Sequence, residues 1–172
     1  MATTFELIKG ATLTGSQASY TFSAIPSTFT DLCLKMSCRT NDSGSWQSAN
    51  NITVNGLTSG YSMTQLRGNY TAPDSVRNSS QTTWHDINQN AVNSTSNTFS
   101  NDEVYFPSYT ASQNKPVSII NVLENNHATN FWINADAALL SNTAAISSIT
   151  ITASGSSFVA GSSFYLYGVK NA

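Results

Sequence analysis

The chain has two histidines, His85 and His127, and they limit the nucleophilic chemistry that it could perform. A serine or cysteine nucleophile needs a base held beside it, itself oriented by a third group. Asp86 follows His85 directly, but neighbouring residues of a strand point to opposite faces, so we expect the two side chains not to act together. His127 lies in the turn-like stretch ENNHATN. The two positions predict hydrogen-bonded or solvated histidines and no catalytic triad.

Carboxylates are the second group that could do chemistry, because a glycosidase needs two of them facing each other. The chain has nine acidic residues, and most of them fall at predicted turns or on predicted outward faces. A carboxylate pair on a β-sandwich, acting as a depolymerase, stays open as the one enzymatic alternative. The acidic residues expected to be outward or in turns are Asp31, Asp42, Asp74, Asp102, Glu103 and Asp136.

Metal and cofactor motifs are missing from the sequence. It contains no CxxC, no HExxH and no glycine-rich phosphate loop. The stretch NDSG (41–44) offers oxygen ligands for Ca²⁺, but an Asx turn explains it, and we favour the turn. The sequence therefore predicts a protein that is not an enzyme and that binds no metal or other cofactor.

Large aromatic side chains at predicted loops and outward strand positions are the remaining candidates for a binding surface. Two interpretations stay open: they cover a second sheet or the ends of a sandwich, or they form a subunit contact or a platform for a sugar. Aromatic residues anchor protein interfaces, and a surface poor in charge suits close packing on neighbours. The candidate interface residues are Trp46, Tyr61, Tyr70, Trp84, Tyr105, Trp132, Tyr165 and Tyr167.

Composition favours a β fold. The 172 residues suit one domain, and only 9% of them are charged, far below the usual quarter. Ser, Thr and Asn together make up roughly two in five residues, which is well above ordinary usage. Thr favours strands, whereas Ser and Asn favour turns. Helix surfaces are normally built from the charged residues that this chain lacks.

Charge and targeting features exclude several partners. The net charge of −2 and the pI near 5.5 provide no basic surface for nucleic acid and no polybasic membrane patch. The first twenty residues contain Glu6 and Lys9 and no apolar signal-peptide region, and no run is long enough to span a membrane. We therefore expect a protein that is made in a cytoplasm and has no nucleic-acid or membrane partner.

The two cysteines agree with a reducing compartment. Cys33 and Cys38 lie on one predicted strand, about 16 Å apart, which is too far for a disulfide. By parity, Cys38 falls on the apolar face and Cys33 on the other face. Both are expected to be reduced structural thiols.

Period-2 patterns recur along the chain and predict an antiparallel β-sandwich of jelly-roll type with about 8–10 short strands and little helix. One pattern (130–136) is expected to point Phe131, Ile133 and Ala135 inward and Trp132, Asn134 and Asp136 outward. Another (115–124) is apolar on both faces, as in a strand covered on both sides. The predicted strands cover residues 4–9, 18–23, 29–39, 51–56, 61–68, 82–88, 102–107, 115–124, 130–136, 147–154 and 162–169.

The connections carry further predictions. Residues 1–172 form one domain, in which 71–100 is a long polar, partly irregular segment. Residues 135–145 could form a short helix or a loop. Gly/Ser turns join 51–56 to 61–68, and the turn ASGSSFVAG sets the register between the last two strands. The final strand, apolar on both sides, is expected to lie inside a sheet or at a subunit contact.

Several stretches resemble the small jelly-roll virion proteins of tailed bacteriophages. The stretches are 5–41, with IPSTFTDL; 53–69, with an Asn-Gly turn; 101–126; and 139–170, with LYGVK. Such proteins occur as capsid decoration (cement) proteins and as tail-associated modules. The resemblance implies a fold and a virion context and provides no catalytic residues. Segment 71–100 lies outside it.

Two functions follow from that resemblance. The first is a decoration protein that assembles in the host cytoplasm, most simply as a homotrimer, and binds and stabilises the major capsid protein shell in the virion. The alternative is a tail or fibre module that binds a host surface glycan through aromatic residues such as Trp84 and Tyr70. The lack of a long coiled or repetitive stem favours the decoration protein.

Overall fold

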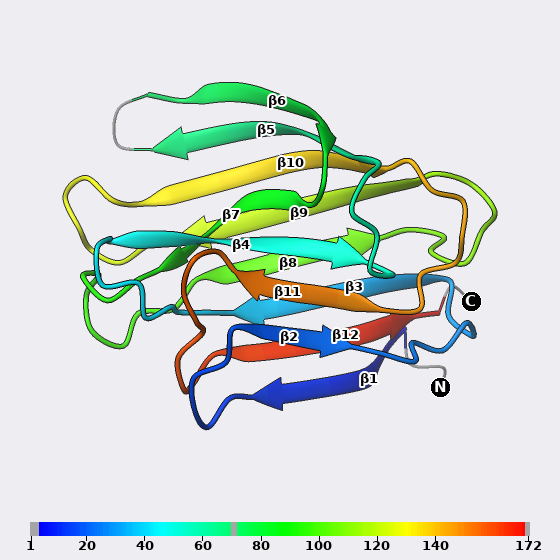
Figure 1. The fold of residues 1–172 in the computed structure, drawn as a ribbon, viewed down its shortest axis with the longest axis horizontal. Helices are drawn as coiled ribbons and strands as arrows, with labels where there is room; N and C mark the ends of the chain where they lie inside the picture. Colours follow the sequence, from blue (N-terminus) through cyan, green and yellow to red (C-terminus); the bar gives the residue numbers. More distant parts are fainter. Residues whose placement is uncertain (1–3, 70–71, 171–172) are drawn as a thin grey trace.

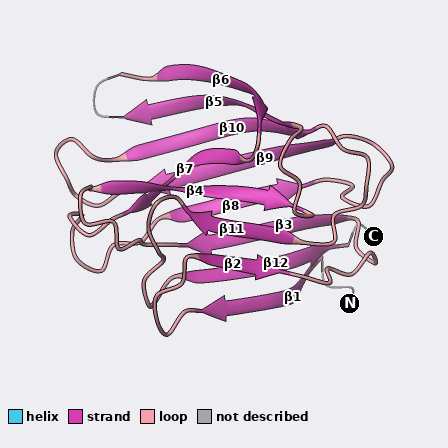
Figure 2. Cartoon of the chain, in the orientation of Figure 1, coloured by secondary structure: helices cyan, strands magenta, loops and turns pink. Residues whose placement is uncertain are grey.

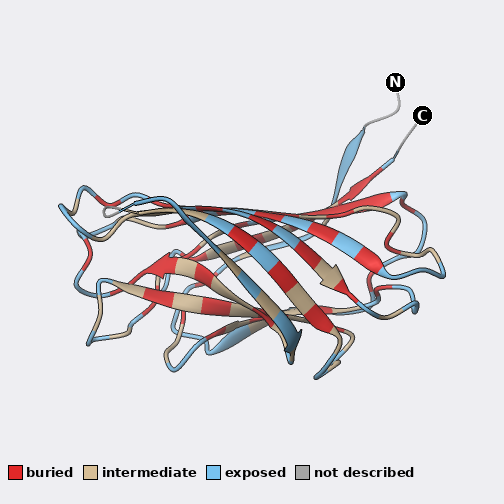
Figure 3. Cartoon of the chain, turned by 90° about the horizontal axis from the view of Figure 1, so that it is seen from above, coloured by how far each residue is buried: buried red, intermediate tan, exposed pale blue. Residues whose placement is uncertain are grey.

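The computed structural model describes residues 4–69 and 72–170, and these form an all-β fold with 55% of residues in strands and no helix (Figure 2). Two antiparallel sheets stack as the layers of a β-sandwich (Figure 3). The described part of the chain has no helix long and apolar enough to span a membrane. The eight-stranded sheet has the order β1 (Phe5–Thr12), β12 (Ser163–Val169), β3 (Asp31–Ser37), β8 (Asn101–Phe106), β9 (Lys115–Leu123), β10 (Trp132–Leu140), β5 (Tyr61–Asn69) and β6 (Asp74–Gln81). The four-stranded sheet has the order β2 (Ser19–Phe22), β11 (Ile149–Ala153), β4 (Gln47–Val54) and β7 (Trp84–Asn90).

The chain crosses between the two sheets repeatedly, and the prediction of an antiparallel β-sandwich is confirmed. It runs from β2 to β3, back to β4, on to β5 and β6, back to β7, through β8, β9 and β10, and then to β11 and β12 (Figure 1). Strands that follow each other in sequence therefore mostly lie in opposite layers. β4 and β5 are not a hairpin, and neither are β11 and β12. The expectation that the turn ASGSSFVAG sets the register between the last two strands is wrong, because those strands share no hydrogen bonds.

The core lies between the two layers and follows the period-2 pattern of the sequence. In β4 every second residue is buried, ending in Ile52 and Val54. β12 lies between β1 and β3 and points Phe164 and Leu166 inward. The prediction that the final strand is an interior strand of a sheet is confirmed. Both cysteines are buried and unpaired, as expected.

Two glycines of the large sheet make room for aromatic rings. A Cβ atom on Gly168 would lie 2.3 Å from the ring of Phe29, which packs over it from the core side. A Cβ atom on Gly10 would lie 2.3 Å from the ring of Tyr165 on the opposite face. Each aromatic ring therefore covers a backbone position that any larger residue would block.

The segment 71–100 is more regular than predicted. It contains the whole of β6, which the polar sequence DSVRNSSQ did not indicate, and β7, of which 82–88 was expected. β6 forms because it pairs along β5, a tertiary contact that local propensity does not encode. The described residues form twelve strands, more than the 8–10 predicted, and β6 accounts for part of the difference. Residues 135–145, considered as a short helix, instead continue β10 to Leu140 and then form a loop.

The Arg39 side chain forms several hydrogen bonds to the irregular part of this segment. The Arg39 guanidinium donates hydrogen bonds to the carbonyl oxygens of Val92, Ser94, Thr95 and Thr98 at 2.9–3.2 Å. Burial lowers the Arg39 pKa from its ordinary value, but the group stays charged, because an arginine pKa starts above 12. The Arg39 guanidinium thus provides hydrogen bonds for four carbonyl oxygens of a loop that is not paired in a β-sheet.

Replacing Arg39 by alanine should therefore loosen residues 91–100 and lower the free energy of unfolding by about 2 kcal/mol, since hydrogen bonds from a charged donor are lost. Hydrogen–deuterium exchange measured by mass spectrometry should show faster exchange of this loop with little change in β3 or β12. Arg39→Lys, which supplies one compact charge in place of the planar fork, should restore only part of the protection. Equal exchange in all three proteins would contradict this role.

Candidate interaction surface

The outer face of the eight-stranded sheet is a broad exposed surface with an aliphatic patch. This face is turned away from the four-stranded sheet (Figure 3). Leu66, Ile120 and Ile133 stand on it with exposed fractions of 61%, 44% and 56%. They belong to the adjacent strands β5, β9 and β10. The outer face is defined by Leu7, Cys33, Lys35, Leu66, Glu103, Tyr105, Ile120, Val122, Ile133, Ala135, Tyr165 and Tyr167.

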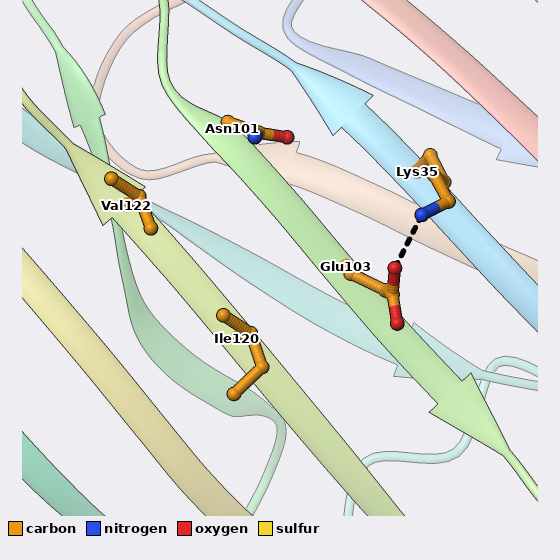
Figure 4. A pocket seen from close by; sticks show the side chains of 5 residues that line it. All are labelled: Lys35, Asn101, Glu103, Ile120 and Val122. Carbon is orange, nitrogen blue, oxygen red and sulfur yellow. Dashed lines mark hydrogen bonds and ion pairs between the residues drawn. The ribbon is translucent and has the colours of Figure 1, made fainter.

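Charges on the outer face are few: they include one ion pair and the exposed Arg77 of β6, whose guanidinium donates a hydrogen bond of 3.0 Å to the Thr64 hydroxyl. Lys35 on β3 forms an ion pair with Glu103 on β8, beside Ile120 and Val122 (Figure 4). The Asp31 carboxylate is buried, where it accepts a hydrogen bond of 2.6 Å from the Tyr105 hydroxyl. That hydrogen bond raises the pKa of Tyr105 to about 12. The face therefore presents little unbalanced charge to a partner.

The outer face also lacks a reactive thiol. Cys33 is opposite Tyr167 on one side and Tyr105 on the other, and only 1% of it is exposed. Burial raises the pKa of the Cys33 thiol to about 11. Because the thiolate is the nucleophile, a buried thiol of this kind is chemically inert at neutral pH.

The size of the outer face suits a protein partner. Eight strands at ~4.8 Å spacing, each about seven residues long, make a face of about 900 Å². A standard protein–protein interface buries about 800 Å² on each partner, so this face alone is large enough for one.

The structure distributes the described members of the predicted interface set over four regions, one of which is the core. Tyr105, Tyr165 and Tyr167 are half-buried on the outer face, among its aliphatic residues. Trp132 is half-buried on the inward side of β10, where the Arg67 guanidinium lies 5.8 Å from the centre of its ring. Trp46 is 40% exposed at one end of the sandwich, and its ring centre lies 4.0 Å from that of His127. Tyr70 lies outside the described residues.

Tyr61 and Trp84 were expected on the surface, and that expectation is wrong. They are 1% and 0% exposed and pack edge to face at 5.1 Å between ring centres. Tyr61 also accepts a hydrogen bond at its hydroxyl from the backbone N–H of Val54, 2.8 Å away. The polar neighbours of Trp84 in sequence suggested a loop, but β7 places its ring in the core. Neither residue is available for an interface or a sugar.

The inward and outward faces of β10 are the reverse of those predicted. Asn134 and Asp136 are buried between the sheets, whereas Ile133 and Ala135 are on the outer face. Gln65, directly opposite Asp136 on β5, is also buried. Parity could have revealed this, because Leu140, at the end of the same strand, is inward with Asp136. The aliphatic patch was missed for this reason.

Strand β9 was expected to be covered on both faces, and it is covered on one. Val117 and Ile119 are buried, but Pro116, Ser118 and Ile120 are exposed. The apolar residue Ile120 on its second face is therefore part of the exposed outer face and not of a second core.

The expected separation of His85 and Asp86 is also wrong. The Nδ1 atom of His85 lies 3.0 Å from Oδ2 of Asp86. Asp86 has a φ of 60°, so the backbone leaves the extended conformation and the two side chains meet on one side. No serine is hydrogen-bonded to this pair among the interactions of the described residues. No group of three or more His, Cys, Asp or Glu side chains in residues 4–69 and 72–170 could hold a metal ion.

A buried polar network lies between the sheets, where acidic residues were expected to be outward. Asp102 is fully buried and accepts hydrogen bonds from Gln89 (3.1 Å), Ser100 (2.9 Å) and Asn121. Burial raises the pKa of Asp102 to about 7, although the three hydrogen bonds act in the opposite direction. Burial likewise raises the pKa of Asp136 to about 6. Both carboxyls lie in the interior, where Asp102 is 0% and Asp136 5% exposed.

No protein-family model matches the chain, and no curated protein matches it.

Proposed function

We propose that this protein is a structural component of a phage virion, a capsid decoration (cement) protein that binds the major capsid protein and stabilises the shell. The observation that carries the proposal is the outer face of the eight-stranded sheet, which is broad, nearly neutral and apolar over β5, β9 and β10. Such a face binds by burying apolar area and needs no chemistry. The resemblance to jelly-roll virion proteins supplies the virion context.

The assembly that we propose is a homotrimer made in the host cytoplasm and placed on the capsid, each copy presenting its outer face to a capsid subunit. Burial of the aliphatic residues removes apolar area from water, and the tyrosines beside them are of the residue type that most often dominates the binding energy of an interface. Many weak contacts, repeated over a shell, add up to a large stabilisation.

The glycan-binding alternative loses one of the two residues on which it rested. Trp84 is a core residue, and Tyr70 lies outside the described part of the chain. Trp46 is still exposed, but the ring of His127 lies against it. The geometry therefore favours a protein partner over a sugar.

Capsids stripped of this protein test the proposal. Adding the wild-type protein back should raise the temperature at which the particles release DNA. The double variant Leu66→Asp/Ile133→Asp should bind at least about tenfold more weakly, because it buries two charges at the centre of the contact.

Val92→Asp is the matched control, since Val92 is 49% exposed on a loop that is not part of the outer face. It should restore heat resistance as the wild type does. Heat resistance that does not change with the wild-type protein would refute the proposed function. If the wild type, the double variant and Val92→Asp all bound equally well, the capsid contact would not lie on the outer face.

A further inference from the structure

Strand β1 forms an uncovered edge of the eight-stranded sheet. It is the outermost strand in the sheet order and pairs with β12 on one side only (Figure 1). In residues 4–69 and 72–170, no strand pairs with its other side. Six of its eight residues are exposed and none is buried. An antiparallel pair uses the backbone groups of alternate residues, so β1 presents a row of unpaired N–H and C=O groups to a further strand.

A β-bulge decides which side chains of β1 share a face. Leu7 is opposite Tyr167 and Lys9 is opposite Leu166, so Ile8 is the extra residue. Lys9 therefore lies on the same, inward-directed face as Glu6, which is opposite Gly168. Without the bulge, residues three apart would lie on opposite faces.

Phe5 and Gly10 lie on the outward-directed face of β1. Phe5 is opposite Val169 and Gly10 is opposite Tyr165, so the bulge brings these two residues to one face as well. Phe5 and Leu7 on this face are 50% and 53% exposed, although both are large and apolar. A monomer thus exposes two apolar side chains on an open sheet edge.

The sequence of β1 is complementary to itself in the antiparallel direction. When two copies are related by a two-fold axis normal to the sheet, inward residues face inward residues and outward residues face outward ones. Placing Glu6 of one strand opposite Lys9 of the other satisfies this condition at residues 5, 6, 9 and 10, and only the bulge residue Ile8, which packs against the core, faces an outward residue, Leu7. The same register places Lys9 opposite Glu6, and Phe5 opposite Gly10, where it meets the Tyr165 ring that already covers this glycine.

We propose that the free edge of β1 pairs with the β1 strand of a second copy of this chain, joining two eight-stranded sheets into one continuous sheet. Charge complementarity selects this partner, because both cross-strand ion pairs form only between antiparallel copies. In a parallel in-register arrangement Glu6 would face Glu6 and Lys9 would face Lys9, and like charges directly opposite are destabilising. Charges and bulges on an edge strand usually prevent it from pairing with other chains. On β1 they restrict pairing to the β1 strand of a second copy.

The contact is small. One eight-residue strand on each side buries less than the area of a standard interface, so association of the isolated protein should be weak and concentration-dependent. On an array of many copies such a contact gains from multivalency. The β1–β1 contact can join two single protomers, or two protomers that belong to different trimers. It does not depend on the virion proposal, because it is tested on the isolated protein.

Sedimentation equilibrium of the full chain from about 10 μM to about 1 mM tests the pairing, because this range brackets a weak contact. The weight-average mass should rise towards twice that of the smallest species. The charge variants are made in a Lys170→Ala background, because Lys170 is the partner of Glu6 within the chain, with a 2.8 Å contact. Lys170→Ala alone should associate as the wild type does.

Glu6→Lys and Lys9→Glu, each alone, should weaken association at least tenfold, because like charges then face each other twice. Mixing the two variants should restore it to within about threefold of the parent, since every cross-strand pair in the mixed dimer is again of opposite charge. Circular dichroism checks that each variant keeps its sheet content.

A wild-type mass that stays constant over the concentration range would overturn the proposal, and so would a mixture that associates no better than its two components. If association occurs but capsids gain no heat resistance, the edge contact stands and the decoration function fails. The two proposals can therefore fail separately.

Discussion

Replacing Trp84 by alanine is expected to lower the free energy of unfolding by about 3–5 kcal/mol, the usual cost of removing a large aromatic residue from a core. Trp84 is 0% exposed, and its ring packs against Tyr61 and Phe106 at 5.1 and 6.2 Å between ring centres. It lies on β7, the edge strand of the four-stranded sheet, so the cavity opens where that sheet meets the large one. Denaturation by urea, followed by circular dichroism, measures the loss.

Two variants show whether the loss comes from the core position itself. Trp84→Phe should cost less than half as much, because it keeps most of the apolar volume and removes an indole N–H that has no hydrogen-bond partner. Trp46→Ala removes a tryptophan that is 40% exposed and should change the free energy of unfolding by less than about 1 kcal/mol. If Trp84→Ala lowered the free energy of unfolding as little as Trp46→Ala, the placement of Trp84 in the core by β7 would be contradicted.

The core position of Trp84 also affects the interpretation of binding experiments with the Trp84→Ala variant. A Trp84→Ala protein that fails to bind a host surface would not identify Trp84 as a sugar contact, because the variant loses core packing. Trp46→Ala is the informative substitution for glycan binding, since its ring is at the surface and its removal leaves the core intact.

Stability should fall as the pH rises from about 4 to about 7, because of Asp102. Its pKa is raised from the ordinary value of 3.8 to about 7 in the folded protein. Between these values the folded state keeps a proton that the unfolded chain releases, so each pH unit costs about 1.4 kcal/mol and the whole interval about 4 kcal/mol. Above the folded-state pKa both states are ionised, and this loss levels off. Asp136, with a pKa raised to about 6, acts in the same direction.

Guanidinium denaturation at several pH values from 4.5 to 8 measures this dependence. Asp102→Asn should flatten most of the slope, since it removes the titrating group. Asp74→Asn is the matched control, because the hydrogen bond from Arg67 lowers the pKa of Asp74, which therefore titrates below this pH range. Asp74→Asn should keep the slope of the wild type.

A second measurement covers the case in which Asp102→Asn does not fold. The ¹³C NMR shift of the Asp102 carboxyl in the wild-type protein should change around neutral pH. A carboxyl that is already ionised at pH 5, or stability that rises with pH over this range, would contradict the assignment.

The positions of most strands could be predicted from the sequence because their cause is local. Alternating apolar residues, as in β3 and β12, bury one face of a strand in almost any sandwich. A chain with few charged residues and abundant Thr, Ser and Asn has little material for helix surfaces. β6 is the exception, because its polar sequence becomes a strand only by pairing along β5.

The candidate surface could be predicted only in part. Three of the tyrosines named from the sequence lie on the outer face, but Leu66, Ile120 and Ile133, which form its aliphatic patch, were not named. The error came from β10, where an alternating pattern has two faces and the apolar one was assumed to be inward. The inner face is polar there because its neighbours are polar: Asn134 donates to the backbone oxygen of Asp86, and Gln65 lies opposite Asp136.

The sequence by itself determined that this protein is an all-β sandwich with reduced cysteines and a surface poor in charge. These properties follow from residue types and from a two-residue period. Only the tertiary structure decided which face of each strand is buried, which strands are neighbours and which edge is free. Those outcomes depend on side chains that other strands supply, such as Asn121 and Gln89 around Asp102, and no local pattern contains them.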